Sequence, residues 1–149
     1  MKRFEKKVLS IDFDYFQKVS VETMIKCYPD GIDRSTEIST MVWGSHYGNP
    51  HTKALLNEVS ILEDEFRNMT DILLNQDSSI PVMIANSHVN IYDFIHDNVS
   101  ESEKMFLVNV DMHHDMFNDN QVVDCGNWLG YINRAIWIAN PVSADMYSL

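Results

Sequence analysis

The chain has 149 residues, of which 45% are hydrophobic and 11% aromatic, enough for one globular domain with a buried core. This composition excludes a disordered tail, and its two cysteines, Cys27 and Cys125, exclude a miniprotein held by several disulfides. An excess of 22 acidic residues over 11 lysines and arginines gives a net charge of −11, which disfavours binding to nucleic acid or anionic membranes and suits a cation.

Apolar runs of strand length alternate with segments of helical character along the chain. In chain order we expect a strand over 7–13, a short helix over 15–27, a turn at 28–31, a strand over 37–43, a loop over 44–51, a helix over 52–76, a strand over 80–86, a helix over 90–97, a strand over 105–111, a short helix over 127–134 and a strand over 135–140. The helix over 52–76 is the clearest, because its apolar residues recur every three or four positions.

This order predicts an α/β fold: a compact, three-layer, mostly parallel sheet with helices on both faces, in a single domain over residues 1–149. Continuous apolar strands separated by helices are typical of parallel sheets that are buried on both faces. No segment has the roughly 20 apolar residues of a membrane span or the apolar run of a signal peptide. Since the cysteines are also expected to be reduced, we predict a cytoplasmic protein.

Acidic and imidazole side chains follow three of the predicted strands, where parallel sheets form their sites. These side chains are Asp12, Asp14, His88, Asp111, His113 and Asp115. Alternate residues of an extended backbone point the same way, so Asp111, His113 and Asp115 would converge, and so would Asp12 and Asp14. Such a group is costly to bury without a cation, and the pattern therefore predicts a site for divalent metal.

Four carboxylates and two imidazoles form an oxygen-rich set of donors. Geometry and softness favour Mn²⁺, with Fe²⁺, Co²⁺ or Zn²⁺ as the other ions considered. The number of carboxylates indicates two ions with bridging aspartates, an arrangement that activates water for hydrolysis.

These motifs resemble those of the arginase/agmatinase (ureohydrolase) superfamily, whose members bind two Mn²⁺ ions. The segment DMHHD at 111–115 is similar to its DxHxD motif, and SIDFD at 10–14 is similar to its SxDxD motif. The closer similarity is to the peptide arginase branch, through DFDYF at 12–16, SHVNIYDFI at 87–95 and CGNWL at 125–129. The resemblance covers about residues 7–140.

The resemblance implies an arginase-like domain that converts arginine side chains, in a precursor peptide, to ornithine with release of urea. It implies that one ion is held by His88 and Asp115, that the other is held by His113 and Asp14, and that both are bridged by Asp111 and Asp12. The implied partner is an arginine-containing peptide, with neither nucleic acid nor membrane expected. An incomplete arginase-like sheet could also use a second copy of the chain, as a homo-oligomer.

Three features depart from ordinary arginases. The SxDxD-like motif precedes the DxHHD motif here, whereas it follows in arginases, so the strand connectivity must differ. Ser87 stands where an acidic residue usually precedes the first ligand histidine, which changes a partner of that ligand. The chain is also much shorter than a typical arginase, so truncation at the C-terminus stays open.

Proton transfer and guanidinium binding each have several candidate residues. His114, beside the ligands, and His46, in the loop expected over 44–51, are the candidate catalytic residues for proton transfer, with His51 as another. Asp119 or Asp124 could pair with a guanidinium, which favours a planar bidentate partner.

Two other functions stay open. The pair His114-Asp115 and the Asp12-x-Asp14 motif could belong to a metal-dependent phosphohydrolase, although HD domains are helical and the phosphatase motif has a small hydroxyl residue where Phe16 stands. The third reading is a noncatalytic arginase-like domain that binds a peptide. A metal assay with an arginine-containing peptide would separate the three.

Overall fold

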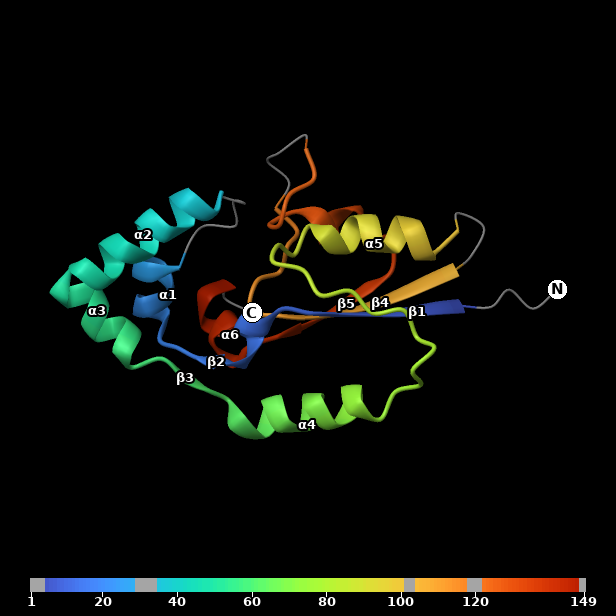
Figure 1. Ribbon diagram of the computed structural model, residues 1–149, viewed down its shortest axis with the longest axis horizontal. Helices are drawn as coiled ribbons and strands as arrows, with labels where there is room; N and C mark the ends of the chain where they lie inside the picture. Colours follow the sequence, from blue (N-terminus) through green and yellow to red (C-terminus); the bar gives the residue numbers. More distant parts are fainter. Residues whose placement is uncertain (1–4, 29–34, 101–103, 118–121, 148–149) are drawn as a thin grey trace.

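A three-stranded parallel sheet, in the order β1–β4–β5, lies at the centre of the molecule (Figure 1). The computed structural model describes residues 5–28, 35–100, 104–117 and 122–147. The sheet contains β1 (Glu5–Ile11), β4 (Lys104–Asp111) and β5 (Ala135–Ala139), and a separate antiparallel ribbon contains β2 (Gln17–Lys18) and β3 (Ser60–Ile61). The expected α/β class is therefore confirmed, with three parallel strands in the central sheet.

Helices lie on both sides of this sheet (Figure 1). The α-helices are α1 (Val21–Cys27), α2 (Thr36–Gly48), α3 (Pro50–Asn57), α4 (Glu63–Leu74), α5 (Asn90–Asn98) and α6 (Pro141–Tyr147), and the short 3-10 helices are η1 (Phe13–Phe16) and η2 (Trp128–Tyr131). Among the described helices, none has the length and apolar character needed to cross a membrane.

The face of the sheet that meets α5 carries the main buried core. Leu107 of β4 is fully buried there and packs with Ile91 and Ile95 of α5 and with Trp128 and Leu129 of η2. Full burial of one such aliphatic side chain contributes about 1.5–3 kcal/mol. This cluster therefore holds α5 and η2 on the sheet, close to the strand ends.

The opposite face of the sheet is partly open. The register places Leu9, Val108 and Ile136 side by side on it. Leu9, Ile136 and Ile138 remain 45%, 50% and 42% exposed, and α4 packs against η1. The helix cover that we expected on both faces is thus present on the α5 face and incomplete on the other.

The strand expected over 37–43 and the loop expected over 44–51 are both wrong, because these residues form α2 and the start of α3. The Ser35 side chain caps α2 by accepting a hydrogen bond from the backbone N–H of Ile38, and Glu37 suits the positive end of the helix dipole. Asn49 caps α3 in the same way, with Pro50 at its first position. Capping therefore outweighs the β-branched composition of this segment.

The single helix expected over 52–76 is interrupted between α3 and α4. There β3 pairs with β2, and the N–H of Leu62 donates to the carbonyl of Phe16 at 2.7 Å. The apolar periodicity continues through the break. It could not reveal that pairing with a distant segment would end one helix and start the next.

The strand expected over 80–86 is also wrong: these residues have no strand assignment, and Ile84 is 96% exposed. Pro81 lacks the N–H that a sheet ladder requires. The helix expected over 15–27 divides into η1, β2 and α1, and the turn expected at 28–31 lies outside the described residues beyond Tyr28. The strands expected at 105–111 and 135–140 and the helix at 90–97 are confirmed as β4, β5 and α5. The strand expected at 7–13 is present as β1 but ends at Ile11, and the helix expected at 127–134 is present only as the short 3-10 helix η2.

The segments that follow the three strands are fixed next to one another. The N–H of Asp12 donates to the carbonyl of Val110 at 2.8 Å, which extends the contact between β1 and β4. Buried Asn140, just after β5, donates through Nδ2 to the carbonyls of Tyr15 and Gln17 at 2.6 and 2.8 Å. Hydrogen bonds therefore join the segments at the carboxyl ends of β1, β4 and β5.

Candidate metal centre

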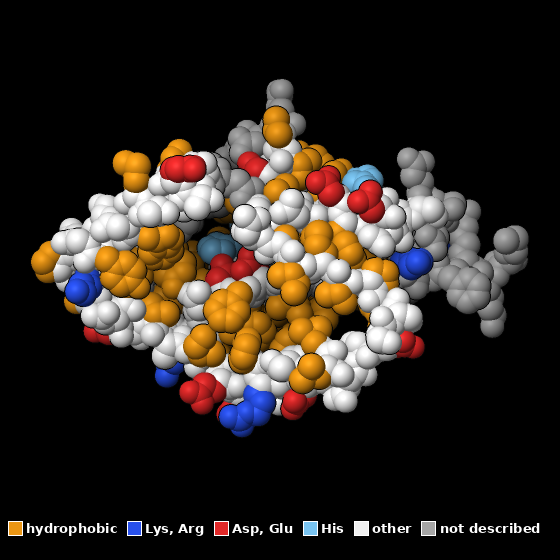
Figure 2. Space-filling view, in the orientation of Figure 1, with side chains coloured by type: hydrophobic (Ala, Val, Ile, Leu, Met, Phe, Trp, Pro, Cys, Tyr) orange, Lys and Arg blue, Asp and Glu red, His pale blue; other side chains and the backbone are white. Residues whose placement is uncertain are grey.

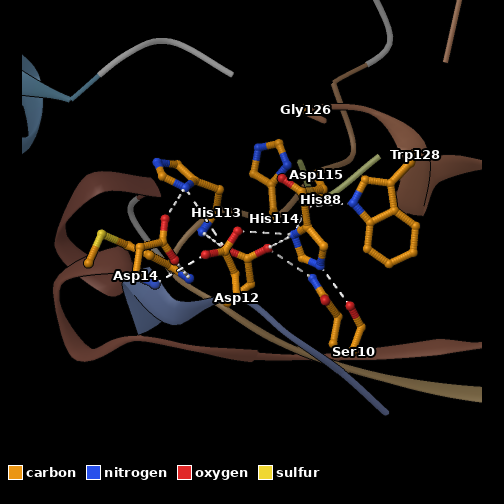
Figure 3. Close-up of polar contacts among 12 residues, drawn as sticks. Ser10, Asp12, Asp14, His88, His113, His114, Asp115, Gly126 and Trp128 are labelled. Atoms are coloured by element: carbon orange, nitrogen blue, oxygen red, sulfur yellow. Dashed lines mark hydrogen bonds and ion pairs between the residues drawn. The ribbon is translucent and has the colours of Figure 1, made fainter. Parts of the chain in front are cut away.

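Side chains from three distant segments meet at the carboxyl ends of β1 and β4 (Figure 3). They include all six metal-type residues expected from the sequence, namely Asp12, Asp14, His88, Asp111, His113 and Asp115. His88 lies in the loop before α5, so a segment far along the chain from both carboxylate motifs contributes a histidine to the cluster.

The imidazole of His88 lies among three carboxylates. Its Nδ1 is 2.9 Å from Asp111, 3.1 Å from Asp115 and 3.4 Å from Asp12. Its Nε2 lies 2.6 Å from Oγ of Ser10 on β1. One ring nitrogen thus contacts a hydroxyl, and the other faces the acidic side chains, as Figure 3 shows.

The imidazole of His113 lies on the other side of Asp111. Its Nδ1 is 2.9 Å from Oδ2 of Asp14 and 3.9 Å from Oδ1 of Asp111. Backbone groups hold the two carboxylates: the N–H of Met112 donates to Asp14 at 3.2 Å, and the N–H of His113 donates to Asp111 at 2.8 Å. The turn after β4 therefore orients both acids.

Two groups of three residues could each hold a metal ion, because their ligand atoms all lie within 4.8 Å of one another. One group is Asp12, His88 and Asp111, and the other is Asp14, Asp111 and His113. Asp111 belongs to both and is only 1% exposed. Carboxylate oxygens with imidazole nitrogens are suitable ligands for divalent first-row metals.

Burial disfavours the charged form of three acids in this cluster, Asp12, Asp14 and Asp111. It is the largest effect on Asp12, and together with the charges of Asp14 and Asp111 it raises the pKa of Asp12 to about 6. Burial is also the main cause that raises the pKa of Asp14 and of Asp111. Without a cation, Asp12, Asp14 and Asp111 therefore tend to keep protons.

The two histidines compensate part of this negative charge. Burial is the largest effect on His88 and lowers its pKa, but the hydrogen bonds and charges of Asp111 and Asp115 outweigh it and raise the pKa to about 10. Burial likewise opposes the effect of Asp14 on His113, whose pKa still rises to about 9. A divalent cation would replace these protons and relieve the same repulsion.

Several side chains that support the cluster were not assigned a role from the sequence. Trp128 is fully buried and donates from Nε1 to Oδ2 of Asp115 at 2.7 Å. Buried Asn109 donates to Asp111 at 3.3 Å, and its own Oδ1 accepts no hydrogen bond from the described residues. Ser10 belongs to the SxDxD-like motif, which was the one sequence signal for its place beside His88.

The expected proton-transfer residues lie at different places. Nδ1 of His114 accepts a hydrogen bond from the N–H of Met116 at 2.9 Å, and its ring packs on Phe117 and Tyr147. His46 lies in α2, where its ring contacts Trp43. These contacts place His46 in the layer of α2 and α3, whereas His114 is the chain neighbour of the candidate ligands His113 and Asp115.

The other expected residues have local contacts. Nε2 of His51 lies 3.0 Å from Nζ of Lys26 on the surface. Asp124 accepts a hydrogen bond from the N–H of Gly126 at 3.0 Å, within the turn before η2. Asp119 lies outside the described residues.

The fold and the cluster define a small α/β protein with Asp and His side chains that could hold a metal ion at the ends of its parallel strands. A comparison with models of protein families, with curated proteins and with solved structures finds no match to this chain.

Proposed function

We propose that this protein is a metal-dependent hydrolase of guanidino groups, which converts arginine side chains in a precursor peptide to ornithine and releases urea. The proposal includes an arginase-like three-layer fold, two ions with Mn²⁺ as the first choice, and a cytoplasmic location. Its main support is the shared position of Asp111, which contributes to both groups of metal-type ligand atoms.

The donor set supports a pair of ions. A fully ionised cluster of four carboxylates is unfavourable when buried, and the two imidazoles turn Nδ1 toward these acids. Asp111, which both groups contain, would bridge the two ions, as the resemblance to ureohydrolases also implies. Two adjacent divalent ions would supply the Lewis acidity that activates water for hydrolysis.

Other side chains of the protein would hold the ligands in place and transfer the proton. Ser10 orients His88, and Trp128 holds Asp115 through its indole N–H. Breaking the C–N bond of a guanidino group requires a hydroxyl group for the carbon and a proton for the departing amine. His114 and His46 stay the predicted carriers of that proton.

The direct test supplies the full chain with Mn²⁺ and an arginine-containing peptide. We expect urea in solution and ornithine in the peptide by mass spectrometry, with about two Mn²⁺ per chain by elemental analysis. His113→Ala should lose both the second ion and the urea. His96→Ala, which removes an exposed imidazole from α5, is the matched control and should keep both.

Each alternative reading has its own outcome in the same experiment. Release of phosphate from a phosphomonoester, with no urea, would overturn the proposal in favour of a phosphohydrolase. Full occupancy by metal and firm binding of the peptide, with neither product, would overturn it in favour of a noncatalytic peptide-binding domain.

A further inference from the structure

An aromatic cleft lies beside the metal centre, between η1 and the layer of α2 and α3. Its volume is about 230 Å³, and it is lined by the aromatic side chains of Phe13, Tyr28, Trp43 and Tyr47 and by aliphatic side chains such as Leu56. Pockets for drug-sized ligands measure roughly 300–1,000 Å³, so this cleft suits a single side chain. Figure 2 shows acidic and histidine side chains in a recess with hydrophobic side chains beside it.

The cleft adjoins the site without being part of it. Phe13, one of its walls, stands between Asp12 and Asp14 in η1. None of the six metal-type residues lines the cleft. A group in the cleft would therefore sit next to the reacting group rather than in its place.

The walls are arranged for a positive charge. The rings of Tyr28 and Trp43 pack edge to face, with centroids 5.9 Å apart and an angle of 87° between them, and both rings line the cleft. The negative face of an aromatic ring attracts a cation within about 6 Å of its centroid, and tryptophan does so most strongly. A guanidinium also stacks flat on such rings.

The surrounding charge favours the same occupant. No lysine or arginine is among the described residues that line the cleft, and the whole chain carries a charge of −11. The carboxylate of Asp14 acts on Tyr28: burial first, and then this charge, raises the pKa of the phenol to about 12. Tyr28 therefore keeps its proton, which it donates to Oε1 of Gln17. Its hydroxyl oxygen can accept a hydrogen bond from a cation.

We infer that this cleft binds a second arginine side chain of the substrate peptide, next to the arginine that reacts. In an extended peptide, side chains two residues apart point to the same side, and neighbouring residues are about 3.3 Å apart along the chain. One arginine could thus reach the metal centre while the other enters the cleft. The substrate would then be a peptide with closely spaced arginines rather than free arginine, which rests on the proposed hydrolysis of guanidino groups.

The binding part can be tested on the full chain without metal, by the NMR signals of the tryptophan indole N–H groups. The ligand is an arginine residue blocked at both ends, and its control is the blocked citrulline, which has nearly the same shape without the charge. We expect arginine to shift the Trp43 signal at concentrations about tenfold lower than citrulline. The indoles of Trp128 and Trp137 donate to Asp115 and Asp111 at the metal centre, so a shift of these signals without one of Trp43 would place the arginine there and overturn the inference.

The substrate part uses the Mn²⁺-loaded enzyme and two peptides. One carries two arginines separated by a single residue, and the other has citrulline in place of one of them. We expect a KM about tenfold lower for the first, with a similar kcat per arginine, and Trp43→Ala should abolish this difference. Tyr131→Ala, which removes an exposed aromatic ring on η2, should leave the difference intact.

The outcomes separate this inference from the proposed function. Equal shifts by arginine and citrulline, or equal KM values for the two peptides while urea is released, would overturn the arginine site in the cleft. The proposed hydrolase function would then still hold. A selective shift of Trp43 by arginine, with metal bound and no urea formed, would support the cleft as a cation site and overturn the hydrolase.

Discussion

Ser10 and His88 are 78 positions apart in the chain, yet Oγ of Ser10 lies 2.6 Å from Nε2 of His88. A hydrogen bond at one imidazole nitrogen decides which way the other points. Here it turns Nδ1 toward Asp111 and Asp115. The histidine is therefore already oriented to bind an ion together with these carboxylates.

Removing this hydroxyl should weaken metal binding without removing a ligand. We expect Ser10→Ala to lower the affinity for Mn²⁺ by about 10–100-fold, as for other residues that orient a ligand. Competition with a metal-binding dye measures the affinity. Ser45→Ala, at an exposed position of α2, is the matched control and should bind like the parent chain. An unchanged affinity in Ser10→Ala would mean that the carboxylates alone fix the ring.

Two aspartates should differ in how many ions they hold. Asp111 belongs to both ligand groups, whereas Asp14 belongs to one. We therefore expect Asp111→Asn to lose both ions and Asp14→Asn to keep the ion at Asp12 and His88. Elemental analysis after gel filtration gives the number of ions per chain. Two tightly bound ions in Asp111→Asn would rule out its bridging role.

The metal-free chain should become less stable as the pH rises. The pKa of His88 is raised from 6.5 to about 10, so its contribution is fully present below about pH 6.5 and is lost as the pH rises through about 10. The pKa of Asp12, raised from 3.8 to about 6, acts in the same direction at lower pH, because the folded chain binds the extra proton. Thermal unfolding in the presence of a chelator should show Tm falling between about pH 6 and pH 10.

Metal should reverse this trend, because it takes the place of the protons. We expect Mn²⁺ to raise Tm more at pH 8 than at pH 6, and its binding to release about two protons, from His88 and His113. Calorimetric titrations in buffers with different heats of ionisation count these protons. Binding that is independent of pH would contradict ligation through the two Nδ1 atoms.

The two faces of the sheet should respond differently to the loss of a leucine. Leu107 is fully buried under α5, so Leu107→Ala should lower the free energy of unfolding by about 2–5 kcal/mol. Leu9 is 45% exposed on the opposite face, and Leu9→Ala should cost less than about 1 kcal/mol. Urea denaturation of the metal-free variants measures both values. Equal losses would show that the Leu9 face is covered in solution.

The sequence was most informative where an apolar strand ends in metal-type side chains. Strands β1 and β4 are recognisable by the apolar residues in their second halves, and Asp12 and Asp111 stand directly at their ends. Since parallel strands bring their carboxyl ends to one edge, the meeting of these acids follows from the pattern. The segment 37–43 has strand-like composition as well, but Ser35 supplies a helix cap that outweighs it.

By itself, the amino-acid sequence determined the α/β class, the three strands of the central sheet and the Asp and His residues that follow β1 and β4. Only the tertiary structure decided that pairing with β2 interrupts the helix over 52–76, that Ser10 orients His88 and that Trp128 holds Asp115. The reason is physical: periodicity and capping act over a few residues, whereas these contacts join segments that packing alone brings together.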